Sequence, residues 1–536
     1  MPPPQSSEIY DFIIIGSGFG GSVSAHRLTE KGYRVLVLEK GRRLGADDFP
    51  KTNWNLRRWM WIPRLGMRGL FKMTFLPHVT VLSGVGVGGG SLVYANTLPV
   101  PKSPFFKAPS WADLADWEVE LRPHYETALK MLGANRNPNM TRSDEIIRDV
   151  GVEIGRAASF ELTDVAVYFG QPGVTVPDPY FGGKGPPRTG CTACGGCMVG
   201  CRFGAKNTLD KNYLYLAEQG GASVVADTEV VDVRPAPGDT SRPLYEIAAL
   251  KGTSALRAQL ESVSYRARNV IFSGGVLGSV ELLLKLRASG SLPSLSPRLG
   301  DFVRTNSEVL MGVVSMEDVD LSKGIAIGSI LHTDDRSHLE PVRYPAGSGF
   351  FRALTLPHAP GATVTRRLWN AAGAVLKSPW RTFRSMTVPD WAKRTMILLY
   401  MRSEEGTLKL RLGRGLRTGL RQGLSTELGE GPPPKAWLPE ATELGERVSR
   451  HLNGYSQSLL TETLFGVPTT AHILGGACMG DSASTGVIDA RHRVFGYEGL
   501  YVIDGSAVSA NPGVNPSLTI TALAERAMSL IPQKAN

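Results

Sequence analysis

Residues 9–39 begin with Ile-Tyr-Asp-Phe-Ile-Ile-Ile-Gly-Ser-Gly-Phe-Gly-Gly and end with Val-Leu-Val-Leu-Glu, and this stretch decides the fold. An apolar run of strand length comes first, a glycine-rich turn follows, and a segment of helix length leads into a second apolar run. This order predicts a strand, a turn, a helix and a parallel strand, the unit with which α/β domains that bind dinucleotides begin.

The glycines of this turn have separate physical tasks. Gly16 allows the sharp turn after the strand, Gly18 lets the backbone approach a pyrophosphate, and Gly21 lets the helix pack closely on the strand. The diphosphate would lie at the helix N-terminus, where free N–H groups and the helix dipole favour anions. Glu39 follows about 20 residues later, where an acid accepts hydrogen bonds from a ribose. The predicted contacts also include Phe19 and Gly20.

The composition is that of a large globular protein. The chain has 536 residues, 42% hydrophobic and 20% charged, with a formal net charge of +10, which is enough for two domains. No apolar run approaches the roughly 20 residues that span a bilayer. The first residues show neither the basic nor the apolar region of a secretion signal, so we expect a cytoplasmic protein.

The positive charge is concentrated in two segments that are also rich in aromatic residues. Residues 49–112 contain no acid, and residues 365–394 combine arginines with tryptophans. Such segments suit contact with an anionic membrane surface, or a cationic lid whose aromatic side chains point into a substrate pocket, and both interpretations stay open. Nucleic acid is not expected as a partner, because no binding motif accompanies the charge.

A second glycine-rich stretch, residues 82–96, reads Leu-Ser-Gly-Val-Gly-Val-Gly-Gly-Gly-Ser-Leu-Val-Tyr-Ala-Asn. So many glycines leave backbone N–H groups free to line a flat or anionic ligand. Because apolar residues flank the stretch, we expect it to be packed rather than a loose linker. Its predicted ligand contacts are Gly84, Gly88, Gly89, Gly90, Ser91 and Asn96.

Two segments near the end of the chain carry further chemistry. In the first, His472 precedes a double glycine. In the second, a short apolar strand ends at Asp504 and Gly505, the strand edge at which ligands of α/β proteins bind. Asn515 is expected to cap a helix whose first residue is Pro516. The positive end of that helix would stabilise negative charge on a group placed before it.

Four blocks of this sequence together resemble the glucose–methanol–choline (GMC) oxidoreductases, most closely their cholesterol-oxidase-like bacterial branch. The blocks are residues 16–39, 84–96, 472–480 and 504–525, in the order that the family has, and the resemblance covers nearly the whole chain. It implies FAD as the cofactor and an α/β fold (α+β overall), with a Rossmann-like FAD-binding domain and a substrate-binding domain of β-sheet and helices. The expected FAD-binding segments are 9–99, 205–304 and 466–536, and the substrate-binding segments are 100–204 and 305–465.

The resemblance also implies alcohol oxidation, with His472 and Asn515 as the active-site pair. His472 would accept or orient the proton of the substrate hydroxyl, and the carbinol hydride would pass to flavin N5. Asn515 would hydrogen-bond the substrate oxygen or the flavin edge, and Asp504 would lie near the ribityl chain or the diphosphate. Because the second glycine stretch contains no histidine, FAD is expected to be held non-covalently.

One position departs from the sterol-oxidising members, which carry a glutamate shortly after a Pro-Ala-Gly sequence. Here Pro345, Ala346 and Gly347 are followed by Gly349 in place of that acid. Glu340 lies a few residues earlier, and we interpret it as a surface or structural charge. The departure argues against cholesterol itself as the substrate and against an accompanying double-bond isomerisation.

Four of the five cysteines fall within eleven residues, inside a loop at 190–202. Cys191, Cys194, Cys197 and Cys201 have the C-x2-C-x2-C-x3-C spacing of an iron–sulfur loop, for a [4Fe–4S] or [3Fe–4S] cluster. Zinc and reduced structural thiols are alternatives, although zinc sites usually combine two separated cysteine pairs. A cluster beside a flavin would export single electrons, which predicts a dehydrogenase rather than an oxidase.

The sequence therefore predicts an FAD-dependent oxidoreductase that oxidises a bulky apolar alcohol, sterol-like or terpenoid-like, and passes electrons through an iron–sulfur cluster. Its expected partners are the alcohol and an electron acceptor (O2 or a redox partner), and peripheral contact with a membrane stays an open alternative. Three other functions stay open: a cholesterol oxidase/isomerase that uses O2 without a cluster, a flavin electron-transfer module, and a lyase or isomerase that uses flavin without net oxidation.

Overall fold

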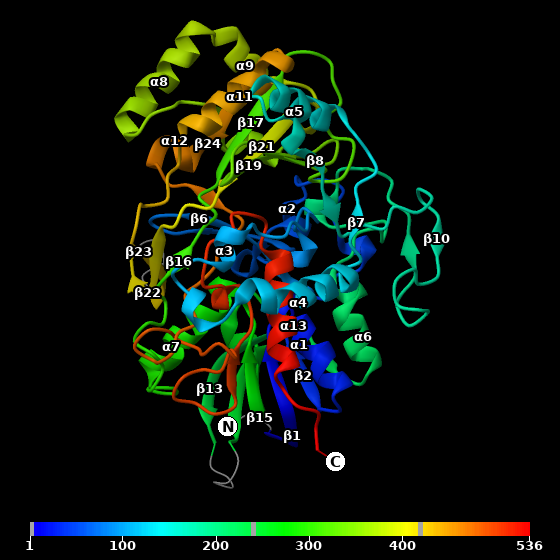
Figure 1. Ribbon diagram of the computed structural model, residues 1–536, viewed down its shortest axis with the longest axis vertical. Helices are drawn as coiled ribbons and strands as arrows, with labels where there is room; N and C mark the ends of the chain where they lie inside the picture. Colours follow the sequence, from blue (N-terminus) through cyan, green and yellow to red (C-terminus); the bar gives the residue numbers. More distant parts are fainter. Residues whose placement is uncertain (1–4, 237–242, 416–421, 536) are drawn as a thin grey trace.

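The computed structural model describes residues 5–236, 243–415 and 422–535. Residues 1–4, on which the expectation about a secretion signal partly rests, lie outside the described residues. Figure 1 shows two large β-sheets arranged along the long axis of the molecule, each with helices of its own. Across the described ranges, no helix combines the length and the apolar character that crossing a bilayer requires.

The lower sheet in Figure 1 is assembled from segments far apart in the sequence. Its order is β12-β2-β1-β15-β14-β13, and β26 pairs with the end of β15. The strands are β1 (Gln5–Ile15), β2 (Val35–Leu38), β12 (Ser223–Val225), β13 (Thr228–Pro235), β14 (Tyr245–Lys251), β15 (Glu261–Phe272) and β26 (Leu500–Val502). Five of its strands, β12, β2, β1, β15 and β26, run parallel.

Continuous apolar runs form these parallel strands because both faces of the sheet are covered. Ile13 and Ile14 at the centre of β1 are fully buried, and each contributes roughly 1.5–3 kcal/mol to the free energy of unfolding. The helices that pack with this sheet are α1 (Phe19–Glu30), α4 (Trp117–Met131), α6 (Tyr213–Gln219), α7 (Glu281–Ser289) and α13 (Ser517–Ser529).

The first glycine turn brings α1 close to β1. Gly16 has a φ of 102°, a left-handed conformation that favours glycine. A Cβ at Gly21 would overlap the carbonyl oxygen of Gly16, so only glycine permits this approach of the helix to the strand. Gly20 is equally constrained from the other side, by the carbonyl oxygen of Ile503.

The upper sheet is antiparallel, in the order β20-β24-β17-β21-β19-β18-β8. Its strands are β8 (Phe160–Leu162), β17 (Val309–Ser315), β18 (Ser329–His332), β19 (Ser337–Val342), β20 (Thr355–Pro357), β21 (Thr395–Arg402) and β24 (Gly454–Leu459). Apolar side chains of α5 (Arg142–Glu153) and α11 (Pro439–His451) share one buried cluster with β17 and β21. These helices therefore cover one face of the sheet and leave the other for the cavity described below.

The division of the chain into domains stays a prediction, and the packing of two segments departs from the expected ranges. Leu121 of α4 and Leu408 of β22 (Thr407–Arg414) belong to the same buried cluster as β1, although both were expected in the substrate-binding part. β22 pairs with β16 (Val303–Arg304) and β23 (Gln422–Leu428). The insertions thus cover the lower sheet as well as building the upper one.

A short parallel pairing brings the C-terminal chemistry beside the second glycine stretch. Thr469 and Thr470, the two residues of β25, pair with Thr80 and Val81 of β6 (Thr80–Gly84), which also pairs with β5 (Phe71–Phe75). Since His472 follows β25 and Gly84 ends β6, two segments nearly 400 residues apart in the sequence become neighbours.

We expect Gly20→Ala to lower the free energy of unfolding by at least 1–3 kcal/mol, because the added methyl group overlaps the backbone of Ile503. Gly373→Ala, in the middle of α8 (Val364–Lys377) with nothing within 4 Å of the new Cβ, should instead raise it by about 0.5–1 kcal/mol. Thermal unfolding of both variants checks this, and equal midpoints would contradict the packing described.

Candidate active site

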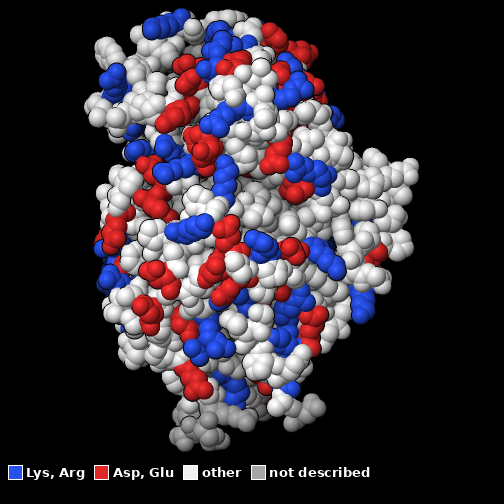
Figure 2. All heavy atoms as spheres, in the orientation of Figure 1, with Lys and Arg blue, Asp and Glu red and all other residues white. Residues whose placement is uncertain are grey.

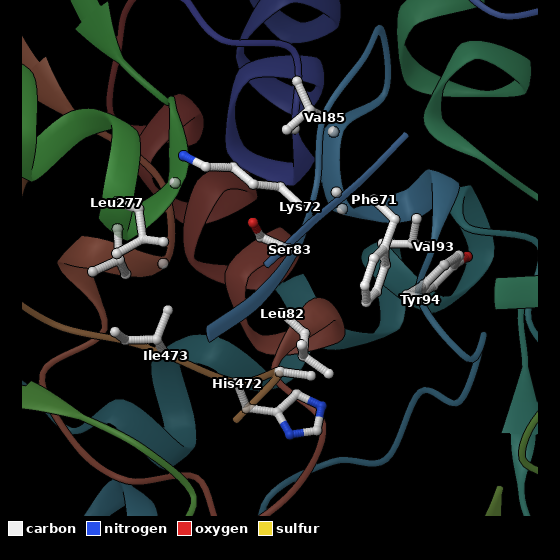
Figure 3. A pocket seen from close by; sticks show the side chains of 18 of the residues that line it. Phe71, Lys72, Leu82, Ser83, Val85, Val93, Tyr94, Leu277, His472 and Ile473 are labelled. Carbon is white, nitrogen blue, oxygen red and sulfur yellow. The ribbon is translucent and has the colours of Figure 1, made fainter. Parts of the chain in front are cut away.

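A cavity of about 520 Å³ is lined by residues from the lower sheet, the upper sheet and the second glycine stretch. Figure 3 shows His472 at one side of it, with Lys72, Ser83, Tyr94 and Leu277 around the remainder. The predicted residues that line the cavity are Gly16, Gly18, Phe19, Gly20, Glu39, Gly84, Gly89, Gly90, His472, Asp504, Gly505, Asn515 and Pro516. Most of the predicted site is thus brought together.

Four predicted contacts do not line the cavity, and they are Gly21, Gly88, Ser91 and Asn96. Gly21 serves the packing of α1, and Ser91 closes a turn by donating to the carbonyl of Gly88 at 2.7 Å. Asn96 is buried with a φ of 73°, and neither atom of its amide has a partner among the described residues. Gly21, Gly88 and Ser91 therefore support the cavity wall without lining it.

Both predicted acids hold backbone at the edge of the cavity. Glu39 accepts hydrogen bonds from the N–H groups of Ser17 and Gly41, at 3.0 and 2.8 Å. Asp504 accepts from the N–H of Gly275 at 2.8 Å and of Ser506 at 2.8 Å, which joins the two turns that follow β15 and β26. Burial raises the pKa of Asp504 despite these donors.

The two glycine stretches meet at the cavity. A Cβ at Gly89 would lie 2.7 Å from the Cα of Gly18, so the turn before α1 and the second stretch are in backbone contact. Ser17 joins them further, because its Oγ donates to Glu39 and accepts from the N–H of Gly88. This close approach explains why residue 89 is a glycine.

His472 is held by a glutamate that the sequence did not point out. Its Nδ1 lies 3.1 Å from Oε2 of Glu308, whose Oε1 accepts a hydrogen bond from Oγ1 of Thr470. Because this carboxylate accepts at both oxygens, Nδ1 of the imidazole donates, and the lone pair of a neutral His472 then sits on Nε2. Glu308 immediately precedes β17, 164 residues before His472, and no spacing rule joins the two.

The electrostatics of the pair favour a protonated imidazole. Burial alone would lower the pKa of His472, but attraction to Glu308, the hydrogen bond with it and the charge of Glu340 together raise the pKa above its usual value. Glu308 is 1% exposed and His472 12%, so solvent screens their interaction weakly. His472 is therefore suited to receive a proton and to keep it while the reaction proceeds.

Asn515 does not cap α13, contrary to the sequence prediction. The residue before the helix is Pro516, and no side chain caps the helix there. The Asn515 amide nitrogen instead donates to Oε2 of Glu340 at 3.3 Å and lies 3.5 Å from Nε2 of His472. Its Oδ1 has no partner among the described residues. The amide is thus free to engage a ligand beside the imidazole.

Of the two sequence interpretations of Glu340, a surface charge is wrong and a structural charge agrees with its place in the fold. Glu340 lies in β19, is completely buried and contacts Asn515 on one side and His338 on the other, with Oε1 3.3 Å from Nε2 of His338. It does not line the cavity. Glu340 therefore acts on the cavity through its hydrogen bond with Asn515, whose amide it positions.

The basic, aromatic segment at 49–112 contributes to the cavity rather than only to the surface. Trp59 is fully buried and stacks on Phe71 with ring centroids 4.4 Å apart, and Phe71 lines the cavity. Lys72 lines the cavity too, and burial together with the neighbouring Lys40 lowers its pKa to about 8. These side chains favour the pocket interpretation of the segment.

The cysteine loop does not have the geometry of the predicted iron–sulfur centre. In the parts of the chain that the structure describes, no three His, Cys, Asp or Glu side chains converge so as to hold a metal ion, and all four thiols are free. Cys191, Cys197 and Cys201 pack instead against the apolar cluster of Val165, Val167, Ala205 and Ile325. Burial raises the pKa of Cys191 to about 12, with Cys197 adding to the effect, which suits a thiol in an apolar core.

The loop is joined to the second glycine stretch by a buried lysine. The ammonium group of Lys206 donates to the carbonyl oxygens of Leu92, Tyr94 and Cys197 at 3.1, 2.9 and 2.8 Å. Burial lowers the pKa of Lys206 to about 7. The loop therefore supports the cavity wall from behind, which agrees with the alternative of reduced structural thiols.

Comparison with known proteins agrees with this geometry. The GMC oxidoreductase family model matches residues 440–524, and a model of NAD(P)-binding Rossmann-like domains matches residues 14–80. The chain is 46% identical to a cholesterol oxidase of Acinetobacter baumannii, over 98% of this chain and 95% of that protein. It is also 46% identical to a cholesterol oxidase of Mycobacterium tuberculosis (strain ATCC 25618 / H37Rv), over 98% and 91% of the two chains.

The chain belongs to the GMC oxidoreductase family. As the sequence predicts, it is an FAD-dependent alcohol oxidoreductase of the cholesterol-oxidase-like branch. Among solved structures, pyridoxine 4-oxidase from Mesorbium loti shares its fold, with a TM-score of 0.62 and 15% identity over 97% of this chain and 98% of that one.

The cavity of this GMC oxidoreductase fits FAD. The turn at Gly16–Gly18 and the start of α1 present backbone to the cavity, with Gly16 and Gly20 at positions where no Cβ is tolerated. Glu39 follows the end of β2 and accepts from the N–H of Ser17 in this turn. These residues would hold the diphosphate and the ribose, and the second glycine stretch would lie against the ring. Non-covalent attachment of FAD stays a prediction.

Glu308→Gln removes the charge that stabilises the protonated imidazole, so the pKa of His472 should fall. If neutral His472 is the base in flavin reduction, the acid limb of the pH–rate profile moves to lower pH in this variant. Anaerobic stopped-flow measurement of flavin bleaching between pH 5 and 9 checks the shift. His358→Gln is the matched control, since that buried histidine bonds Ser458 and Thr442 instead, and an unshifted Glu308→Gln profile would contradict the assignment.

Purified protein should contain stoichiometric flavin and no more than trace iron or acid-labile sulfide, even after anaerobic reconstitution. The reason is that the four thiols do not converge on one point. Iron and sulfide analysis beside the visible spectrum measures this directly. About four irons per flavin would restore the iron–sulfur interpretation.

Proposed function

We propose that this enzyme oxidises the hydroxyl group of a bulky, apolar, sterol-like alcohol and uses O2 as the electron acceptor. The observation that carries the proposal is that the His472–Asn515 pair opens into a large cavity with an apolar wall. Such alcohols reside in lipid, so the proposal includes contact with a membrane.

The wall is built partly by the face of the upper sheet that α5 and α11 leave uncovered and partly by residues outside the strands of that sheet. Its apolar lining consists of Leu310, Ile327, Val342, Tyr344, Phe351, Trp391, Ile397, Leu399 and Leu459. Few charged side chains interrupt it, whereas Lys40, Lys72, Lys285 and Glu281 lie in the part of the cavity near Glu39. The polar part suits a dinucleotide and the apolar part suits a ring system with a single hydroxyl.

The polar pair can bind one hydroxyl group. The substrate O–H donates to Nε2 of His472, and the amide nitrogen of Asn515 donates to the same oxygen, since the two atoms are 3.5 Å apart. Glu308 stabilises the imidazolium that forms when the proton is taken. When bound, FAD supplies the acceptor for the hydride that leaves the carbinol carbon.

Direct use of O2 is proposed because the cysteine loop offers no converging ligand set through which electrons would leave. Electrons and protons balance with the alcohol and O2 as the two reactants. The alcohol loses two electrons and two protons to become a ketone, and O2 takes up both to become hydrogen peroxide. Similarity to two cholesterol oxidases supports both the substrate class and the acceptor.

Double-bond isomerisation is not part of the proposal. Glu340 is the acid nearest to Asn515, but it lies behind the amide and outside the cavity lining. A carboxylate in that place positions Asn515 and does not reach the carbon skeleton of a substrate.

Anaerobic mixing with a panel of 3-hydroxysteroids and terpenoid alcohols should bleach the flavin, and aerobic turnover should give one hydrogen peroxide per ketone. His472→Ala should slow bleaching by 10²–10⁴-fold, because it removes the general base. His358→Gln should react as the wild type does. Bleaching by small hydrophilic alcohols alone, or ketone formation without peroxide, would contradict the proposal.

A further inference from the structure

The helix pair α8 (Val364–Lys377) and α9 (Pro379–Thr387) presents apolar side chains to solvent. Trp369 and Leu376 are each 81% exposed, Trp380 is 67% exposed and Phe383 is 58% exposed. These side chains recur at helical spacing along one outward face, and the rings of Trp380 and Phe383 stack with centroids 5.8 Å apart. Figure 1 shows the pair projecting from the upper sheet at the top left.

The outward orientation is fixed by polar anchors on the opposite face. Arg367 of α8 is buried and donates to the carbonyl oxygens of Thr463 and Gly361, at 3.3 and 2.8 Å. On α9, Thr382 shares a 2.7 Å hydrogen bond with the hydroxyl of Tyr455. The apolar face is therefore solvent-facing because the inner face is bonded to the sheet.

The charged residues of the segment that carries this apolar face are all basic. Residues 341–389 contain neither Asp nor Glu, and Arg366, Lys377 and Arg384 are exposed on the two helices. Figure 2 shows only neutral and basic side chains on this projecting part of the surface. Exposed tryptophans beside lysine and arginine are the combination that inserts at the headgroup level of an anionic leaflet.

The helix pair is also connected to the apolar part of the cavity. Gln457 lines the cavity and donates to Oγ of Ser385 in α9 at 3.1 Å, and Trp391, shortly after α9, lines the cavity too. A bilayer that contacts α8 and α9 would thus lie next to the sheet face that forms the apolar wall.

We propose that α8 and α9 form a docking surface for an anionic lipid bilayer, into which Trp369, Leu376, Trp380 and Phe383 insert. The role of this surface in delivering substrate rests on the function proposed above, whereas the binding itself does not. Val119 of α4 is 62% exposed and lies between Glu118 and Glu120 on a different helix, so it provides a control.

Sedimentation with phosphatidylcholine vesicles, with and without 30% phosphatidylglycerol, tests the docking. The wild-type holoenzyme should bind the anionic vesicles at least tenfold more tightly, and 0.5 M salt should weaken the binding. The triple variant Trp369→Ser, Leu376→Ser, Trp380→Ser should lose at least tenfold in vesicle affinity, while Val119→Ser should bind as the wild type does. Arg366→Glu with Arg384→Glu should abolish the preference for anionic lipid.

Unchanged vesicle binding by the triple variant would overturn the proposal. A wild-type dimer that the triple variant loses, with no vesicle binding by either, would also overturn it in favour of a second copy of the chain as occupant. Enzyme activity separates the docking proposal from the proposed function. On substrate solubilised with cyclodextrin the triple variant should match the wild type. On substrate held in vesicles the triple variant should be slower. If the wild type oxidises no apolar alcohol, the proposed function fails, and sedimentation still decides the docking.

Discussion

The hydrogen bond between His472 and Glu308 joins the two halves of this molecule at the candidate active site. Glu308 immediately precedes the central strand β17 of the upper sheet, and His472 follows β25, which pairs with the strand leading into the second glycine stretch. Neither half contains an active site alone. The imidazole has a defined tautomer and a raised pKa because the upper sheet supplies a buried carboxylate to a loop of the lower half.

A second buried carboxylate, that of Glu340, orients the amide of Asn515 beside the imidazole. Glu308 accepts from the imidazole, and Glu340 accepts from the amide of Asn515, so both members of the polar pair are hydrogen-bonded to an acid. The remaining hydrogen-bonding capacity of both groups, Nε2 of the imidazole and the atoms of the amide, is directed to one small region. Buried acids are costly unless hydrogen-bonded. Glu308 accepts at both oxygens, whereas Glu340 accepts at Oε2 and its Oε1 has no hydrogen-bond partner among the described residues.

Sequence reasoning recovered the features that depend on local geometry. The packing roles of Gly16 and Gly21 and of most glycines in the second stretch were predictable, because close backbone approach at these positions excludes a side chain and so leaves a recognisable glycine pattern. Glu308 and Glu340 were not predictable, since an acid inside an apolar strand or at its start looks the same whether its partner is water or a histidine 164 residues away.

At Asn515 and in the cysteine loop, the sequence prediction rested on a local pattern that the structure does not follow. Asn-Pro before a helix predicts a cap, but α13 begins after Pro516, and Oδ1 of Asn515, the atom that a cap would use, has no partner among the described residues. The amide nitrogen of Asn515 donates to Glu340. The cysteine spacing predicts a cluster, but the backbone between Cys191 and Cys201 directs the thiols into an apolar core.

A crystal structure of the FAD-loaded enzyme with a bound steroid ketone tests the central claim most directly. The account predicts the ketone oxygen within about 3.2 Å of both Nε2 of His472 and the amide nitrogen of Asn515, with the ring system against the upper sheet. A ketone oxygen bonded to neither group, with the His472–Glu308 hydrogen bond broken, would contradict it.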